Sequence, residues 1–507
     1  MTDTLQQQLS LRFYQDVLER AGVTESAIAA EADLPIAYVT DDSRNVRNRT
    51  LFVCKGAAFK REYLLQAIEA GAVAYVSAID YDVDIPCILV NDIRRTLGLL
   101  ADAAYGHPSG DIDVVAFTGT KGKTTSVYYL RSMLEAQAER TASHAPAFIT
   151  GVEYDDGVEC GESKLTTPES FELERRIANA ASSGCGQLVM EASSQALKYH
   201  RTLGVEFAVG AFTNFGEDHI SPIEHPTMED YFTSKTMLFD SCRSAVVNLD
   251  MDVSERVLEA ARAAGCERVL TYSLCTLEAD VAVLAYERRG DTIVARVRTP
   301  RFTMELVVPS PAKFNLINAL GAIACAEALD VSEQDMRNGL ASARVPGRME
   351  LYPGKTGRIV GVVDYAHNGM SLETLLRDLR ESYPDREIAV VFGATGGKGV
   401  DRRETMGVAA GKLADRIVIT EDDPGPEDPA DIARAIADAV DRQGNHEWKI
   451  VLDRSEAIET AVRETRDRAV VVVTGKGSDP FMLRHGVREP YEPDGEQLRR
   501  ALAKWNG

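Results

Sequence analysis

The stretch Val114-Val-Ala-Phe-Thr-Gly-Thr-Lys-Gly-Lys-Thr-Thr125 predicts the centre of an α/β fold. Its first four residues form an apolar run that is typical of a buried strand, and the glycines after it predict a tight turn. A helix is predicted next, because Val127, Leu130 and Leu134 recur on one helical face. A strand, a glycine-rich loop and a helix in this order can bind phosphate, since the loop N–H groups and the helix dipole both favour an anion.

Two side chains of this loop suit a nucleoside triphosphate and its metal ion. Lys123 can reach the β- and γ-phosphates, and the Thr124 hydroxyl can coordinate Mg²⁺. The full G-x-x-x-x-G-K pattern is not met, because Phe117 stands at its first glycine position. The chain has no N-K-x-D motif, which disfavours a GTPase. The predicted nucleotide-binding loop consists of Gly119, Thr120, Lys121, Gly122, Lys123, Thr124 and Thr125.

The rest of the chain predicts three α/β domains. A chain of 507 residues suggests about three domains at roughly 150 residues each. Turn-rich breaks at 105–111 and 345–347 place an N-terminal domain at 1–108, a central phosphate-loop domain at 109–344 and a C-terminal domain at 345–507. In the C-terminal domain, strands and helices alternate in the pattern of a Rossmann-like doubly wound parallel sheet. The strands expected there are 359–364, 388–392, 416–420, 449–452 and 469–474.

Composition narrows the class of protein. The 56 Lys and Arg residues against 78 Asp and Glu residues give a net charge of −22, which argues against general binding of nucleic acid or an anionic membrane. We see no apolar run of about 18 residues and no signal-peptide pattern at the start, so we expect a cytoplasmic protein. The eight cysteines contain no C-x-x-C pair and predict free thiols. A metal ion, if bound, should be a hard cation with oxygen ligands.

A series of short motifs accompanies the phosphate loop. In chain order they are Asp42-Ser43-Arg44, Thr166-Thr167-Pro168-Glu169, Glu191-Ala-Ser193-Ser194 with Arg201, Thr213-Asn214 with Asp218-His219, Tyr231-Phe232-x-x-Lys235, Phe314-Asn315-x-x-Asn318, Gly347-Arg348-Met349-Glu350, Asp364-Tyr365-Ala366-His367 and Gly475-Lys476-Gly477. Each motif is weak alone. In this joint order they resemble the Mur ligase family, whose ATP-dependent enzymes build the peptide stem of peptidoglycan, and most closely its members that add the third amino acid.

The resemblance implies a reaction and a set of site residues. ATP would phosphorylate the D-Glu γ-carboxylate of UDP-MurNAc-L-Ala-D-Glu, and the amine of an amino acid would attack the acyl phosphate. Catalysis is then expected from Lys123, a CO₂-derived carbamate on Lys235, His219 and Arg348. Two Mg²⁺ ions are expected, with ligands among Thr124, Glu191, His219 and the carbamylated Lys235. The resemblance places Asn318, Arg348 and Asp364 at ATP, and Ser43, Thr166, Thr167, Ser193 and Arg201 at the UDP-MurNAc-dipeptide.

Two points stay open in this assignment. His225 lies six residues after His219, so either histidine can face the metal ion; His219 is favoured. A folylpolyglutamate synthetase, a sister Mur ligase adding another amino acid, and an inactive homologue that only binds ATP are the competing functions. Ser43 and the Thr166–Pro168 segment favour a uridine-diphosphate sugar, and the intact Lys123 and Lys235 argue against an inactive protein. The expected partners are small-molecule substrates only, and the expected state is a monomer.

The segment Asp422-Asp423-Pro424-Gly425 bears on the amino acid that is joined. Family members that use meso-diaminopimelate carry Asp-Asn-Pro-Arg here, and the Arg binds the far carboxylate of that substrate. With Gly425 in its place, that carboxylate would lose its cationic partner. We therefore predict L-lysine, with L-ornithine second and diaminopimelate third. The residues expected at the amino acid are Arg403 for the α-carboxylate, Asp423 and Asp479 for the terminal ammonium, and Asp422 and Gly475.

Overall fold

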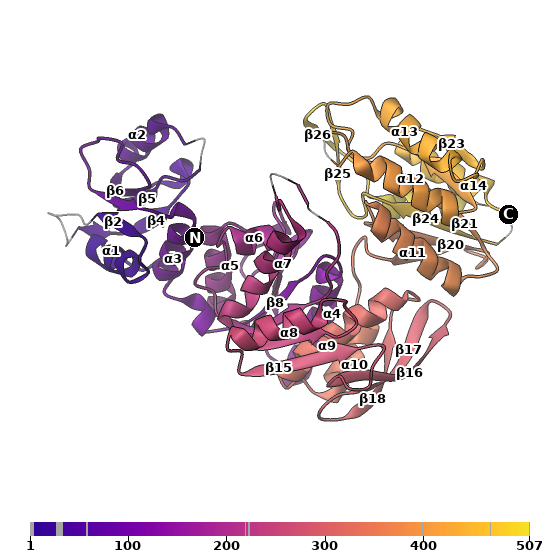
Figure 1. The fold of residues 1–507 in the computed structure, drawn as a ribbon, viewed down its shortest axis with the longest axis horizontal. Helices are drawn as coiled ribbons and strands as arrows, with labels where there is room; N and C mark the ends of the chain where they lie inside the picture. The colour runs from indigo at the N-terminus through magenta and orange to yellow at the C-terminus, as the bar shows by residue number, and fades with distance from the viewer. Residues whose placement is uncertain are drawn as a thin grey trace. The chain divides into compact units, whose positions relative to one another are not determined.

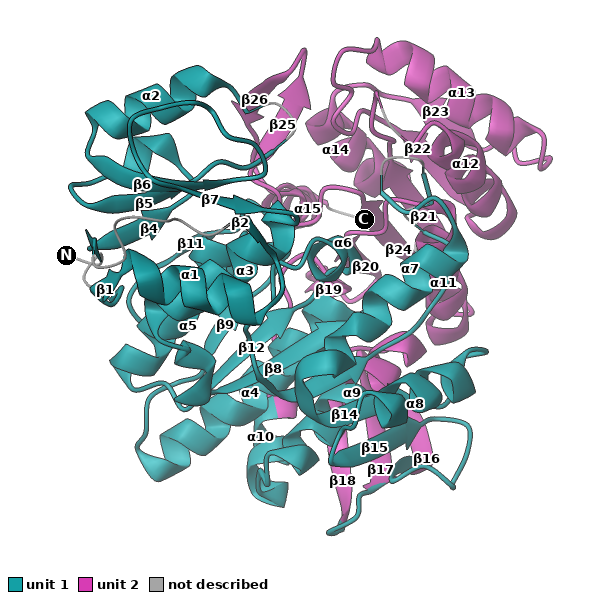
Figure 2. Ribbon diagram, turned by 60° about the vertical axis from the view of Figure 1, so that its left-hand side comes forward, with its two compact units in different colours: residues 1–282, 298–302, 320–339 teal, residues 283–297, 303–319, 340–507 magenta. Residues whose placement is uncertain are grey.

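The structure, a computed structural model, describes residues 5–26, 34–56, 59–218, 220–221, 224–397, 399–466 and 468–505. The chain is a mixed α/β protein (Figure 1) and forms two compact units (Figure 2). Unit 1 comprises 1–282, 298–302 and 320–339, and unit 2 comprises 283–297, 303–319 and 340–507. The boundaries at 108/109 and 344/345 stay a prediction. Within the described ranges, every helix is too short or too polar to cross a membrane.

The N-terminal part of unit 1 is a small sheet with helices on both faces. Its strand order is β2-β7-β6-β5-β4, with β4 to β7 parallel and β2 antiparallel at the edge. Leu51 and Val53 face the core shared with α1 and α3, whereas Phe52 between them faces α2, because strand side chains alternate. The elements are β1 (Leu9–Ser10), α1 (Leu11–Arg20), β2 (Thr24–Ser26), β3 (Pro35–Ile36), β4 (Tyr38–Thr40), β5 (Thr50–Val53), α2 (Arg61–Glu69), β6 (Ala72–Ser77), β7 (Cys87–Val90) and α3 (Ile93–Tyr105).

The central sheet of unit 1 confirms the strand predicted at 114–117. From β11 to β15 its strands follow the order β11-β10-β9-β12-β8-β13-β14-β15, and β9, β12, β8, β13, β14 and β15 run parallel. The elements are β8 (Asp113–Thr118), α4 (Lys123–Thr141), β9 (Ala147–Ile149), β10 (Glu153–Asp155), β11 (Cys160–Glu162), α5 (Ser170–Ser183), β12 (Gln187–Glu191), α6 (Ser194–Lys198), β13 (Phe207–Phe212), α7 (Met228–Thr236), β14 (Cys242–Asn248), α8 (Ser254–Ala263) and β15 (Arg268–Ser273).

This strand order positions the candidate site. Because β8 lies between β12 and β13, the loops after all three strands meet at one edge of the sheet. Glu191 at the end of β12 pairs with Phe117, and Phe212 at the end of β13 pairs with Thr118. The phosphate loop that follows β8 is therefore flanked by the residues that follow its two neighbouring strands.

The C-terminal sheet of unit 2 confirms the predicted doubly wound pattern. Its order is β19-β20-β24-β21-β22-β23, with β19 antiparallel and the others parallel. Ile388, Val390 and Phe392 of β21 face the core with α11, α12 and α13, and Ala389 and Val391 face α14 and α15. The elements are β19 (Glu350–Pro353), β20 (Ile359–Asp364), α11 (Gly369–Ser382), β21 (Glu387–Phe392), α12 (Asp401–Leu413), β22 (Arg416–Ile419), α13 (Pro429–Asp441), β23 (Trp448–Ile450), α14 (Arg454–Glu464), β24 (Ala469–Thr474), β25 (Phe481–Arg484), β26 (Val487–Pro490) and α15 (Asp494–Lys504).

The remaining elements lie between β15 and β19 along the chain. They are β16 (Val281–Arg289), β17 (Thr292–Arg298), β18 (Thr303–Val308), α9 (Lys313–Ala328) and α10 (Glu333–Ser342). Strands β16 to β18 lie mainly in unit 2, and α9 and α10 contribute residues to both units.

Candidate functional site

The phosphate loop has the backbone geometry that its glycines predict. Gly119 has φ +141° and Gly122, the N-cap of α4, has φ +83°. A Cβ on Gly119 would lie 2.1 Å from the Thr213 hydroxyl oxygen, so only glycine fits this close approach. The loop is also held from β13, because the Thr213 hydroxyl donates to the Lys121 carbonyl at 2.7 Å and the Asn214 side chain pairs with the Lys121 backbone. The helix predicted after the loop is α4, which begins at Lys123.

The two oxygen ligands predicted for Mg²⁺ lie together in the structure. The Thr124 hydroxyl donates to Glu191 Oε1 at 2.9 Å, and the Gly151 N–H donates to the same oxygen at 2.9 Å. Glu191 is buried. Hydroxyl and carboxylate oxygens are the ligands that Mg²⁺ prefers, so this pair fits the ion. Gly151 is a contact that sequence reasoning missed, because an ordinary glycine carries no signal of its own.

Lys235 is buried beside the phosphate loop. It projects from α7, its Nζ donates to the Gly119 carbonyl at 2.7 Å, and it lies 4.4 Å from the centroid of the Tyr231 ring. Its side chain is 1% exposed. Burial, together with repulsion from Lys123 and Lys121, lowers the pKa of Lys235 well below its usual value, although Asp218 opposes the shift.

The structure gives His225 a set of partners. His225 Nδ1 lies 2.6 Å from Asp230 Oδ2, and Nε2 lies 2.9 Å from the Ser194 hydroxyl oxygen. Burial lowers the pKa of His225, and Lys198 donates to the same Asp230 carboxylate at 2.7 Å. Both ring nitrogens are thus engaged within the chain. His219, the histidine favoured for the metal ion, lies outside the described residues.

The residues predicted at the UDP-MurNAc-dipeptide fall into two groups in unit 1. The Thr167 hydroxyl donates to the Glu191 carbonyl at 2.9 Å and accepts the Ser193 N–H at 3.0 Å, which ties the Thr166–Thr167 loop to the end of β12. Arg201 pairs with Glu169 at 2.7 Å. Ser43 begins the short 3₁₀ turn Ser43–Asn45 in the N-terminal part. Lys55 of that part lies 3.5 Å from Glu169, so Glu169 contacts cations from both sides.

Three residues predicted at ATP lie in unit 2. Asn318 of α9 is buried, and its side-chain N–H donates to Asn315 at 3.2 Å. Asp364 ends β20 and accepts the Met349 and Ala366 N–H groups at 2.8 and 2.9 Å. Arg348 places its guanidinium 4.2 Å from the centroid of the Tyr365 ring, which follows Asp364 directly. The structure therefore brings Arg348 and Asp364 into one neighbourhood.

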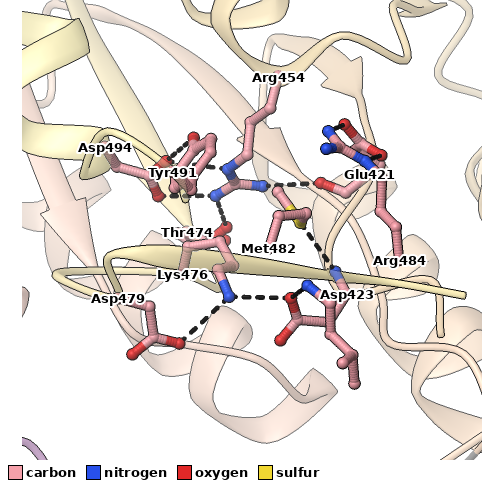
Figure 3. A network of polar contacts seen from close by, with 11 residues as sticks. Glu421, Asp423, Arg454, Thr474, Lys476, Asp479, Met482, Arg484, Tyr491 and Asp494 are labelled. Carbon is pink, nitrogen blue, oxygen red and sulfur yellow. Dashed lines mark hydrogen bonds and ion pairs between the residues drawn. The ribbon is translucent and has the colours of Figure 1, made fainter. Parts of the chain in front are cut away.

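Two residues predicted at the amino acid, Asp423 and Asp479, contact a buried lysine (Figure 3). Lys476 Nζ donates to Asp423 Oδ1 at 2.9 Å and to Asp479 Oδ2 at 3.3 Å, so the two predicted carboxylates do meet. The ammonium of Lys476 between them is a feature that sequence reasoning missed. Arg403, predicted for the α-carboxylate, donates Nη2–H to both oxygens of Glu427 at 2.8 Å.

Asp422, which precedes Asp423 in the chain, is buried. Burial raises the pKa of Asp422 to about 6, against the opposing effect of Arg454 and Lys476. Gly475 has φ +110°, and a Cβ there would lie 2.1 Å from Asp422 Oδ2. Glycine at 475 therefore makes room for the Asp422 carboxylate. Arg454 is fully buried, and its Nε and Nη2 donate to the Asp494 carboxylate at 2.9 and 2.7 Å.

The phosphate loop is flanked by the Thr124–Glu191 oxygen pair and by a buried lysine, and a doubly wound sheet follows it in the chain. This arrangement indicates a nucleotide-dependent enzyme. The Mur ligase middle domain matches residues 117–326, and the glutamate ligase domain of the Mur ligases matches residues 347–477. The chain belongs to the Mur ligase family.

Individual relatives are similar over nearly the whole chain. The UDP-N-acetylmuramoyl-L-alanyl-D-glutamate--L-lysine ligase of Streptococcus pneumoniae serotype 2 (strain D39 / NCTC 7466) is 38% identical over 462 residues, 90% of this chain and 91% of that protein. A solved UDP-N-acetylmuramoyl-L-alanyl-D-glutamate--2,6-diaminopimelate ligase has a TM-score of 0.68 at 24% identity, covering 98% of this chain and 99% of its own. The MurF ligase of Thermotoga maritima in complex with ADP has a TM-score of 0.59 at 18% identity, covering 92% and 96%. These two structures share the fold.

Proposed function

We propose that this protein is an ATP-dependent ligase that joins L-lysine to UDP-N-acetylmuramoyl-L-alanyl-D-glutamate in peptidoglycan precursor synthesis. The observation that carries the proposal is the meeting of the phosphate loop with Glu191 and the buried Lys235 in unit 1. The 38% identity to the streptococcal ligase supports this substrate pair. We expect the reaction to occur in the cytoplasm, and we expect a monomer with no nucleic-acid or membrane partner.

The first step needs cations, because a carboxylate that attacks a γ-phosphate meets like charge. Lys123 would supply one charge at the β- and γ-phosphates, and Arg348 another, since its planar fork suits phosphate oxygens. Asn318 would contact the adenine and Asp364 the ribose. The loop N–H groups would hold the phosphate chain in place while the acyl phosphate forms.

Mg²⁺ fits the residues that are present. Thr124, Glu191, the favoured His219 and a carbamylated Lys235 would hold two ions, which would neutralise charge on the transferred phosphoryl group. Only a neutral amine reacts with CO₂. The burial that lowers the Lys235 pKa supplies that neutral form, which supports the carbamate.

The UDP-MurNAc-dipeptide would bind along Ser43, Thr166, Thr167, Ser193 and Arg201. Thr167 and Arg201 support this assignment, because both are fixed beside Glu191 or its neighbours. Placing the D-Glu carboxylate next to the phosphate loop would make the phosphoryl transfer effectively intramolecular.

L-lysine would bind in unit 2 near Asp422, Asp423, Gly475 and Asp479, with Arg403 at its α-carboxylate. Asp423 and Asp479 carry two negative charges, and Lys476 between them balances one. The remaining negative charge suits a single substrate ammonium. A substrate that also brings a carboxylate to this place would add a second uncompensated negative charge.

The test is phosphate release with ATP, Mg²⁺ and UDP-MurNAc-L-Ala-D-Glu, with L-lysine, L-ornithine and meso-diaminopimelate supplied in turn. We expect the highest kcat/KM for L-lysine. A higher value for meso-diaminopimelate would contradict the choice of amino acid while keeping the ligase. Phosphate release that depends on a folate rather than on the UDP-sugar would contradict the proposed function itself.

A further inference from the structure

The β25–β26 hairpin places an arginine beside Gly425. The Gly425 N–H donates to the Leu483 carbonyl at 3.1 Å, and the His485 N–H donates to the Gly425 carbonyl at 2.7 Å. Gly425 and Arg484 thereby form a parallel bridge outside the sheets. The hairpin also holds the neighbouring Asp423, whose Oδ1 accepts the Leu483 N–H at 2.8 Å. The turn that lacks an arginine of its own therefore has one next to it.

Two carboxylates, those of Glu421 and Glu489, bind the Arg484 guanidinium, and we call this pair the clamp. Arg484 Nε donates to Glu421 Oε2 at 3.0 Å, Nη2 pairs with the other oxygen of Glu421, and Nη1 lies 2.5 Å from Glu489 Oε2. Figure 3 shows the Arg484 guanidinium turned onto Glu421, away from Lys476. The Glu421 side chain is only 8% exposed. One guanidinium between two carboxylates leaves a net negative charge at this place.

We propose that Glu421 and Glu489 make Arg484 a specificity-determining residue, because they withhold its charge from the amino-acid substrate. The inference rests on the proposed function. L-lysine and meso-diaminopimelate differ by one carboxylate at the far end of the side chain. A free guanidinium beside Gly425 would pair with that carboxylate, whereas the clamped one cannot. The clamp thus keeps the Arg484 charge paired within the chain, so that it does not attract the far carboxylate of diaminopimelate.

Of two other arginines near this hairpin, Arg488 serves as the control. Arg454 is committed to Asp494 in the core. Arg488, on the same hairpin as Arg484, is exposed and lies 4.4 Å from the centroid of the Phe481 ring. It takes part in no ion pair in the part of the chain that the structure describes. Replacing Arg488 therefore measures how much an arginine of this hairpin outside the clamp contributes to the choice of amino acid.

The experiment compares kcat/KM for phosphate release with L-lysine and with meso-diaminopimelate. We expect Glu489→Gln, Glu421→Gln and the double variant to raise the diaminopimelate-to-lysine ratio by about tenfold or more, the factor that one charge-assisted hydrogen bond of about 1.4 kcal/mol provides. Adding Arg484→Gln should return the ratio to the wild-type value, and adding Arg488→Gln should not. Glu489 is half exposed, so its variant keeps the test decisive if Glu421→Gln does not fold.

Two outcomes would overturn the inference. One is an unchanged diaminopimelate-to-lysine ratio in the clamp variants, and the other is a rise in that ratio that persists when Arg484→Gln is added. The matched control is Glu492→Gln, which breaks the exposed Glu492–Arg500 pair of the same unit and should leave the ratio unchanged. If the wild type uses L-lysine but the diaminopimelate-to-lysine ratio does not change in the Glu421 and Glu489 variants, only the specificity role is refuted. Wild-type protein that releases no phosphate with either amino acid would refute the proposed function as well.

Discussion

Replacing Glu174 by glutamine should make the free energy of unfolding less dependent on pH. Glu174 lies on α5, is 1% exposed, and neither carboxyl oxygen has a hydrogen-bond partner in the described part of the chain. Phe171 and Ala178, on the same face of the helix, pack into the core of the N-terminal part. Burial and the nearby Asp102 raise the pKa of Glu174 well above its ordinary value of 4.5.

The sign follows from the direction of this shift. The folded state holds the Glu174 proton at pH values where the unfolded state has released it. The contribution of this protonation difference to the free energy of unfolding is fully present below pH 4.5. It is lost as the pH rises toward the folded-state pKa of Glu174. Over that window one proton leaves on unfolding, so the free energy of unfolding falls by about 1.4 kcal/mol per pH unit. Glutamine has the same shape and does not titrate.

The assay is urea unfolding of the wild type and of Glu174→Gln across about pH 5 to pH 8, with the difference plotted against pH. The stability of the glutamine variant relative to the wild type should rise by about 1.4 kcal/mol per pH unit until the pH reaches the folded-state pKa of Glu174. Glu174→Leu, which also removes the unsatisfied polar group, should gain about 1–3 kcal/mol more. The exposed Glu139→Gln is the control and should give no slope. Parallel curves for the wild type and Glu174→Gln would refute the reasoning.

Three further changes test the candidate site. Lys123→Ala should lower kcat for phosphate release by about 100-fold or more with thermal unfolding unchanged, and near-normal release would contradict the phosphate-loop assignment. Lys235→Ala should be nearly inactive and partly restored by a small added carboxylic acid; a fully active variant would contradict the carbamate. Gly475→Ala should cost about 1–3 kcal/mol of stability and raise KM for the amino acid, because its methyl group overlaps Asp422. Unchanged urea unfolding and KM would show that this space is not needed.

The arrangement of strands and helices was predictable from local patterns. The apolar run before Gly119 became β8, and the helix expected after it begins at Lys123. The alternation after residue 345 became the parallel sheet from β20 to β24. These patterns are legible because strand and helix periods are local properties of the chain. The place of Glu191 at the end of a strand beside β8 was predictable for a similar reason, whereas its joint role with Thr124 came from the family resemblance.

The partners of the charged groups were less predictable. The letters around His225 do not show its partners, yet the fold joins it to Asp230 and Ser194. Nothing in the sequence distinguishes Glu174 from the exposed glutamates. Its place on the packed face of α5 leaves its carboxyl group without a hydrogen-bond partner among the described residues. Burial and pairing depend on segments that are far apart in the chain.

By itself, the sequence determined the phosphate loop, the doubly wound pattern and the family, because each rests on residues at short, ordered spacing. The tertiary structure alone decided which charges cancel. It set Lys476 between Asp423 and Asp479, although 53 residues separate Lys476 from Asp423, and it closed Glu421 on Arg484 across 63 residues. The physical reason is that Coulomb and hydrogen-bond energies depend on distances of a few ångströms and on exclusion of water, which only the folded chain defines.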